Sequence, residues 1–211
     1  MRRDALGGTA LVVGAISGLV TMALHPTGHE VATGAAGRSL AVHGLALAGL
    51  PMTFYGAFVL TRRLAGRAPL AELALSFFGA ASVAVLLAAT ASGFIATDLL
   101  AGMGGGPGSD RMLGEALLDF AASWNQAFAR IHVAASSVAI GLWSVAILKS
   151  GVLSRRAAFY GLIVATLTLL ALLSGRLRLD IHGFGAVVLG QAVWLIALGL
   201  ELRRGEGTIP A

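Results

Sequence analysis

The histidines are the residues of this chain whose chemistry stands out against an apolar background. The chain has 211 residues, of which 57% are hydrophobic and only 12% are charged. Five histidines occur, and they are His25, His29, His43, His132 and His182. Neutral imidazole is a good ligand for zinc, copper, iron and haem iron, and it also titrates near physiological pH. Histidines therefore mark the places where this chain could carry chemistry.

Four of these histidines lie at the ends of long apolar stretches of the sequence. Three of them open the second, fourth and sixth stretches, and one follows the first. If the stretches are membrane-spanning helices, all four lie at one membrane surface, together with an aspartate that ends the third stretch. Ionisable groups at membrane depth are costly unless they are paired or face a cavity, so they mark functional sites. The pattern predicts an outward-facing metal site with the ligands His25, His43, His132, His182 and Asp98.

The expected occupant of this site is a transition metal ion (Zn, Cu or Fe) or haem b, used for redox or metal-assisted chemistry. Imidazoles that converge from separate helix ends would form such a site on rigid elements, with Asp180 or Asn125 orienting them. His29 is separated from His25 by a Pro-Thr-Gly turn, so a solvated loop residue is the alternative there. The chain has no HExxH motif, and a protein without any cofactor is the alternative for the whole site.

Two other functions are compatible with the same residues. The first is a carrier for a small solute or an ion, in which the histidines respond to the external pH. The second is a non-catalytic structural subunit of a larger membrane complex, or a homo-oligomer, in which imidazoles make interhelical hydrogen bonds. The absence of cysteine from the sequence excludes disulfides, thiolate catalysis and Cys-ligated iron–sulfur clusters.

The elements that would position these residues are six apolar stretches, each long enough to cross a bilayer of about 30 Å as a helix of about 20 residues. The predicted spans are 5–24, 39–61, 72–98, 127–148, 157–175 and 181–202. Small residues such as Gly14 and Gly18 lie within the spans and let helices approach closely in lipid. The sequence therefore predicts an all-α integral membrane protein, a compact bundle of six transmembrane helices in a single domain over residues 1–211.

The basic residues predict the orientation of this bundle. With the N-terminus inside, the inner segments hold Arg2, Arg3, Arg62, Arg63, Arg67, Lys149, Arg155, Arg156, Arg203 and Arg204. The outer segments hold Arg38, Arg111, Arg130, Arg176 and Arg178. Because Lys and Arg concentrate in cytoplasmic loops, both termini are expected in the cytoplasm of a bacterial-type inner membrane. The net charge of +5 then reflects lipid headgroups and topology, and no nucleic-acid partner is expected.

Two further patterns concern the connections between spans. Residues 103–108 are rich in Gly and Pro, and the segment that follows them has an apolar face ending in Trp124, so an outer loop at about 103–126 is expected to contain a short amphipathic helix at the interface. That helix is either a lid over the site or a simple connector. The even-numbered spans each place an aromatic residue eleven or twelve positions after their histidine (Tyr55, Trp143, Trp194), which is typical of a threefold repeat of helical hairpins.

Overall fold

The computed structural model describes residues 2–26, 30, 34–66, 68–102 and 108–204, and no strand occurs among them. Its elements are α1 (Arg2–Leu24), α3 (Ala36–Ala65), α4 (Leu70–Ala89), the π-helical turn η1 (Thr90–Ile95), α5 (Ala96–Gly102), α6 (Gly108–Ser150), α7 (Arg155–Leu173) and α8 (Ile181–Arg204). Six helical segments are long and apolar enough to cross a membrane, with α4, η1 and α5 together forming the third. The prediction of an all-α membrane protein with six spans is confirmed.

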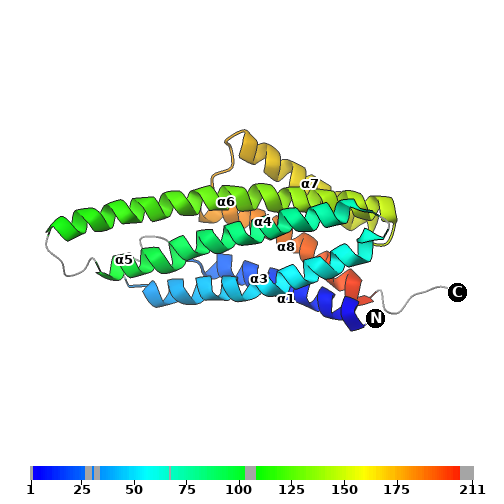
Figure 1. Cartoon of the computed structure of the whole chain (residues 1–211), viewed down its shortest axis with the longest axis horizontal. Coiled ribbons are helices and arrows are strands. Elements are labelled where there is room, and N and C mark those ends of the chain that lie inside the picture. The colour runs from blue at the N-terminus through cyan, green and yellow to red at the C-terminus, as the bar shows by residue number, and fades with distance from the viewer. Residues whose placement is uncertain (1, 27–29, 31–33, 67, 103–107, 205–211) are drawn as a thin grey trace.

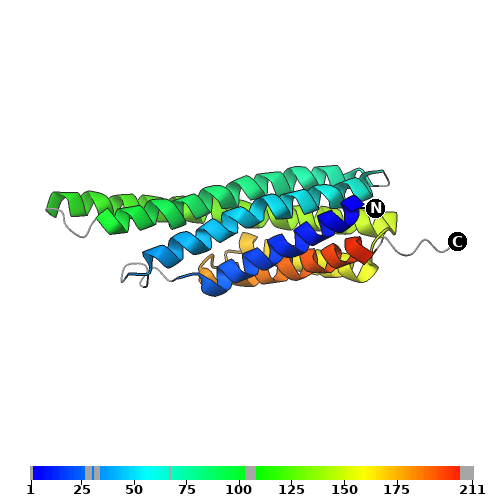
Figure 2. The ribbon, with the colours of Figure 1, turned by 90° about the horizontal axis from the view of Figure 1, so that it is seen from below.

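The helices run side by side along the long axis of the molecule (Figures 1 and 2). One end of the bundle, called here the terminal end, holds the start of α1, the end of α3, the start of α4, the α6–α7 connection and the end of α8. The opposite end, called here the distal end, holds the end of α1, the start of α3, the end of α5, the start of α6 and the α7–α8 connection. In both views the start of α6 and the end of α5 project beyond the other helices at the distal end.

The length of helix α6 explains why its start projects beyond the other helices. It has 43 residues, which at 1.5 Å per residue span about 65 Å, roughly twice the apolar thickness of a bilayer. The predicted interfacial helix before the fourth span is helical, but it is the first part of α6 and no break separates it from the span. No proline interrupts α6, and the rings of Phe120, Trp124 and Phe128 lie along one of its faces in tilted contacts, with successive centroids 5.7 and 5.1 Å apart. The Gly-rich segment 103–107 lies outside the described residues.

Two of the three expected hairpins form packed pairs, namely α1 with α3 and α4 with α6. The third does not, because α7 packs mainly on α6 while α8 packs mainly on α1. Figure 1 shows α7 inclined away from the bundle towards the distal end. A hydrogen bond of 3.2 Å from the Tyr160 hydroxyl to the Gly190 carbonyl is one link between α7 and α8.

Two tryptophans of the repeat close the bundle towards its terminal end. Trp143 and Trp194 are fully buried and stack with their ring centroids 6.1 Å apart. The Trp143 ring nitrogen donates to the Thr61 hydroxyl (3.0 Å), and that of Trp194 donates to the Ala157 carbonyl (3.1 Å). Buried indole N–H groups need such partners. The third aromatic residue of the repeat, Tyr55, lies instead on the lipid-facing surface.

Candidate functional site

The interface between α1 and α8 is tight at the terminal end and opens at the distal end. A Cβ atom built on Gly199 would lie 2.6 Å from the Gly8 carbonyl oxygen, so the two backbones are in direct contact there. Nearer the distal end, a Cβ atom on Gly18 would meet Val188 only at 3.8 Å, and one on Gly185 would meet the Met22 side chain at 3.6 Å. The two helices diverge, and the space between their distal ends becomes part of a cavity.

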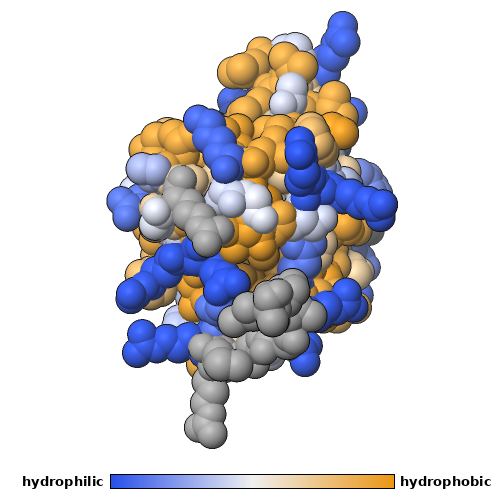
Figure 3. Space-filling model, turned by 90° about the vertical axis from the view of Figure 1, so that its right-hand side faces the viewer, coloured by the Kyte–Doolittle hydropathy of each residue, from blue (hydrophilic) through white to orange (hydrophobic). Residues whose placement is uncertain are grey.

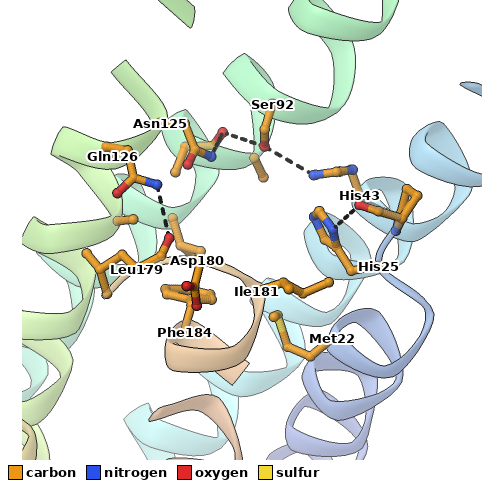
Figure 4. A pocket seen from close by; sticks show the side chains of 15 residues that line it. Met22, His25, His43, Ser92, Asn125, Gln126, Leu179, Asp180, Ile181 and Phe184 are labelled. Carbon is orange, nitrogen blue, oxygen red and sulfur yellow. Dashed lines mark hydrogen bonds between the residues drawn. The ribbon is translucent and has the colours of Figure 1, made fainter. Parts of the chain in front are cut away.

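This cavity has a volume of about 380 Å³ and is shared by α1, α3, α4, η1, α6 and the start of α8 (Figure 4). It is lined by Met22, His25, Pro26, His43, Val85, Ala88, Ala89, Ser92, Asn125, Gln126, Ala129, Leu179, Asp180, Ile181 and Phe184. Trp124, next to Asn125, is exposed on α6, and exposed tryptophans of membrane proteins concentrate at headgroup depth. The cavity therefore opens beside a residue type that is typical of the headgroup region.

His43 is the buried centre of the polar residues in this cavity, with only 4% of its surface exposed. Its Nδ1 atom lies 2.8 Å from the Ser39 carbonyl oxygen, and its Nε2 atom lies 3.1 Å from the Ser92 hydroxyl. A carbonyl oxygen can only accept, so Nδ1 carries a proton and donates it to Ser39. In the neutral ring Nε2 is consequently the acceptor, and it faces Ser92.

The π-helical turn η1 brings Ser92 and Gly93 to this ring. The extra residue in a π turn changes the face that the following side chains present, and such turns frequently occur at functional sites. A Cβ atom on Gly93 would lie 2.5 Å from the His43 Cβ and 2.7 Å from its Cδ2, closer than real Cβ contacts. Glycine at position 93 therefore lets α3 and η1 approach closely enough for Ser92 to meet His43.

A chain of hydrogen bonds links His43 to α6. The Ser92 hydroxyl also lies 3.1 Å from the Ala88 carbonyl oxygen, and the Asn125 amide donates to that same oxygen at 3.0 Å (Figure 4). The hydroxyl has one hydrogen, which goes to Nε2 when the His43 ring is neutral. When the ring is protonated, Nε2 donates and the hydroxyl must turn to Ala88. The arrangement can thus accept one proton without leaving a polar atom unpaired.

His25 is the second imidazole of the cavity. Its ring lies edge-on to that of His43, with centroids 4.9 Å apart, and its Nδ1 donates to the Pro26 carbonyl oxygen at 2.9 Å. As in His43, a backbone carbonyl holds the proton on Nδ1 and leaves Nε2 as the acceptor. A hydrogen bond of this kind also orients the imidazoles that bind metals.

The structure does not bring the other predicted ligands to this pair. The Nδ1 atom of His132 donates to the Ala81 carbonyl oxygen (2.9 Å). The His132 ring packs against Phe184, one of the residues that line the cavity, with the ring centroids 5.8 Å apart. His182 is exposed at the start of α8, and Asp98 is exposed near the start of α5. His29 lies outside the described residues.

The residues present fit a metal ion only in part. Among the described residues, no group of three or more His, Asp or Glu side chains is close enough together to hold one. Haem does not fit between His25 and His43, because bis-histidyl ligation places the imidazoles on opposite faces of the macrocycle and these rings touch edge to face. Two imidazole ligands, completed by solvent or substrate, are the most that the cavity offers to a metal.

Asp180 occupies the cavity rim and begins α8. Its carboxylate accepts hydrogen bonds from the backbone N–H groups of Gly183 (2.9 Å) and His182 (3.1 Å), as an N-cap does. The Gly183 hydrogen bond is the main cause that lowers the pKa of Asp180, with the nearby Arg178 acting in the same direction. The carboxylate is therefore charged at neutral pH and adds one negative charge to the rim.

Three residues that build the polar contacts in or beside the cavity were not expected from the sequence, namely Ser92, Gly93 and Gln126. Ser92 and Gly93 form a polar break in an apolar span, which is a signal, but nothing in the spacing indicates a π turn. Gln126 donates to the Leu179 carbonyl (3.0 Å) and holds the α7–α8 connection against α6. The sequence predicts that Asn125 and Asp180 orient imidazoles. Both line the cavity, but neither makes a hydrogen bond to the His25 or His43 ring. No protein-family model matches the chain, and neither does any curated protein or any solved structure.

Proposed function

We propose that this multi-pass membrane protein binds a small hydrogen-bonding solute in its distal cavity, and that binding is linked to the protonation of His43, as in a pH-responsive carrier. The observation that supports this most strongly is the placement of a buried imidazole between a carbonyl and a hydroxyl in the wall of a cavity. A volume of about 380 Å³ lies within the range of roughly 300–1,000 Å³ typical of small-molecule sites.

The cavity offers hydrogen-bond acceptors to a solute. The Nε2 atom of His25 is an acceptor in the neutral ring and Asp180 is a carboxylate at the rim, whereas the Nε2 atom of His43 already accepts from the Ser92 hydroxyl. Apolar side chains such as Met22 and Phe184 cover much of the remaining surface. This combination favours a solute that donates hydrogen bonds through one part, such as an alcohol or a protonated amine, and is apolar elsewhere.

Protonation of His43 changes this preference. Imidazole is the side chain whose ordinary charge change falls between about pH 5 and 8. A proton on Nε2 turns the Ser92 hydroxyl towards the Ala88 carbonyl and adds a positive charge to the wall of the cavity. Among the described lining residues the other ionisable groups are His25 and Asp180, so a bound solute meets the charge of His43 beside these two.

The orientation follows from the distribution of basic residues. The terminal end holds Arg3, Arg62 and Arg63 together with the basic residues of α7 and α8, and the distal end holds fewer. By the positive-inside rule the termini face the cytoplasm of a bacterial-type inner membrane and the cavity faces outward. The stacked tryptophans Trp143 and Trp194 close the bundle beneath the cavity, so this conformation is the outward-open one.

Thiol labelling tests this proposal directly, because the native chain has no cysteine. Ala129→Cys places one thiol in the cavity wall, and Ala74→Cys places a matched thiol in the closed core. In intact cells a membrane-impermeant maleimide should label the first and not the second. The labelling rate at position 129, divided by the rate for free cysteine at the same pH to correct for thiol ionisation, should change between about pH 8 and 5, and His43→Gln should remove that change in the ratio. Equal labelling of both positions, or a pH dependence of the ratio that persists in His43→Gln, would contradict the proposal.

A two-histidine metal site is the second candidate function. The observation that favours it is that backbone carbonyls hold the Nδ1 protons of His25 and His43, as in metal-binding imidazoles. Titration of the purified protein with Zn²⁺ or Cu²⁺ should then show one ion bound per chain, lost in His25→Ala/His43→Ala and retained in His182→Ala. Identical binding by both variants would rule out this pair as the ligands.

A further inference from the structure

A second pocket lies at the terminal end, on the outside of the bundle between α1 and α3. It has a volume of about 540 Å³ and is lined by Arg3 and Asp4 of α1 and by Tyr55, Phe58, Val59, Arg62 and Arg63 of α3. Three arginines and one aspartate leave the pocket with two net positive charges. Figure 3 views the terminal end and shows hydrophilic side chains projecting around an apolar body. The pocket is thus at the polar boundary of the bundle.

The charges of this pocket are arranged in two groups. Arg63 pairs with Asp4 at 3.2 Å, which joins α1 to α3. The guanidinium carbon of Arg62 lies 5.9 Å from the centre of the Phe58 ring, where the ring face attracts a cation. Arg3 and Arg62 are both exposed, and they supply the positive charge in excess of Asp4.

The floor of the pocket is apolar and faces lipid. Phe58 is 40% exposed and lies about one turn of α3 deeper than Arg62, and Tyr55 is 37% exposed and lies about two turns deeper. Below them α1 and α3 are in close contact, since a Cβ atom on Gly7 would lie 2.5 Å from Val59. The pocket is therefore closed towards the core and open towards the headgroups and the acyl chains of one leaflet.

We propose that this pocket binds the phosphate headgroup of an anionic phospholipid, with Arg3 and Arg62 on the phosphate and an acyl chain along Tyr55 and Phe58. Guanidinium groups match phosphate oxygens with two parallel hydrogen bonds. Basic pockets between transmembrane helices bind anionic headgroups in this way. The apolar floor favours a lipid over a free phosphate ion, because an acyl chain would cover the floor, whereas a phosphate ion would leave it exposed to water. This site is separate from the distal cavity and does not depend on the function proposed for it.

The experiment compares lipid binding to the purified full chain by native mass spectrometry. The probes are phosphatidylglycerol, phosphatidylcholine with the same acyl chains, and inorganic phosphate as a competitor. Phosphatidylglycerol should bind the wild type more tightly than phosphatidylcholine, and Arg3→Gln/Arg62→Gln should weaken it by about tenfold. The matched control Arg155→Gln/Arg156→Gln removes two exposed arginines from the same end of the molecule and should leave the affinity within about twofold.

Three results would overturn the lipid site. These are equal affinity of the wild type for the two lipids, equal losses in the two double variants, and displacement of phosphatidylglycerol by millimolar inorganic phosphate. If Arg3→Gln/Arg62→Gln fails to fold, the wild-type comparison of the two lipids still decides, because a site for an anionic headgroup requires a preference for phosphatidylglycerol.

Discussion

The two ends of the α1–α8 interface use the same kind of residue to opposite effect. At the terminal end Gly8 and Gly199 bring the two backbones into contact. At the distal end Gly18 and Gly185 leave side chains of the partner helix 3.6–3.8 Å from where a Cβ would be. In this interface glycine makes a close backbone contact where a second glycine faces it on the neighbouring helix. Where a larger residue faces it, glycine leaves space, and here the space is part of the cavity.

The polar side chains also differ between the two ends, because those at the distal end point into the bundle and those at the terminal end point outward. At the distal end the polar side chains of His43, Ser92 and Asn125 point into the bundle and are bonded to one another or to backbone carbonyls. At the terminal end Arg62 and Arg63 point outward. The tight end therefore interacts with the membrane surface, while the open end can admit a ligand.

The largest expected effect comes from breaking the tight contact. Gly199→Ala adds a Cβ atom 2.6 Å from the Gly8 carbonyl oxygen, and a backbone atom cannot rotate away, so we expect a loss of stability of about 3 kcal/mol. Gly18→Ala, whose nearest neighbour is at 3.8 Å, should change stability by less than about 1 kcal/mol and in the favourable direction. Thermal unfolding in detergent measures both. Equal effects would mean that the two ends are packed alike.

The next effect concerns the contact between Gly93 and His43. Gly93→Ala should cost about 2 kcal/mol, because the new methyl group overlaps the imidazole, and it should displace the ring from Ser92. The control is Gly79→Ala in α4, where the nearest side-chain atom lies at 3.8 Å. Labelling of the thiol introduced by Ala129→Cys, corrected for thiol ionisation by the rate for free cysteine at the same pH, should also lose its pH dependence in the Gly93→Ala background. A fully retained pH response would show that the Ser92 contact is not needed for it.

A smaller effect is expected from the Ser92 hydroxyl alone. Ser92→Ala removes the partner of His43 Nε2 and should cost about 1 kcal/mol. Ser82→Ala is matched, since Ser82 bonds only the carbonyl one turn back in the same helix, at 2.9 Å. The difference between the two variants isolates the bond to His43. A double-mutant cycle with His43→Gln should show a coupling energy, and strict additivity would contradict the bond.

The smallest effect is a pH dependence at the cavity rim. The Gly183 N–H bond lowers the pKa of Asp180 below its ordinary value, so the charged carboxylate stabilises the folded state at neutral pH. This contribution is lost as the pH falls through the lowered pKa, and protonation then weakens the cap of α8. Asp180→Asn keeps a capping oxygen and cannot titrate. Melting temperatures between about pH 6 and 2 should therefore fall less in Asp180→Asn than in the wild type, and parallel curves would contradict the assignment.

The sequence by itself determined the class of fold. Its long apolar stretches leave too little polar surface for a water-soluble bundle, so six membrane spans follow from hydropathy alone. It also determined that the histidines, together with Asp98 and Asp180, lie at or near the distal ends of these spans. His25, His43, Asn125 and Asp180, all identified from the sequence, do line one cavity there.

Only the tertiary structure decided which of these residues meet. His132 faces the Ala81 carbonyl of α4, eleven residues before the Ser92 that meets His43, and no spacing along the chain specifies that placement. The turn η1 depends on how α4 packs against α3 and α6, so the meeting of Ser92 with His43 is not encoded in any local pattern. The pairing of α8 with α1 likewise depends on two glycines, Gly8 and Gly199, far apart in the sequence. Helix rotation and neighbour choice arise from contacts between distant segments, which hydropathy does not describe.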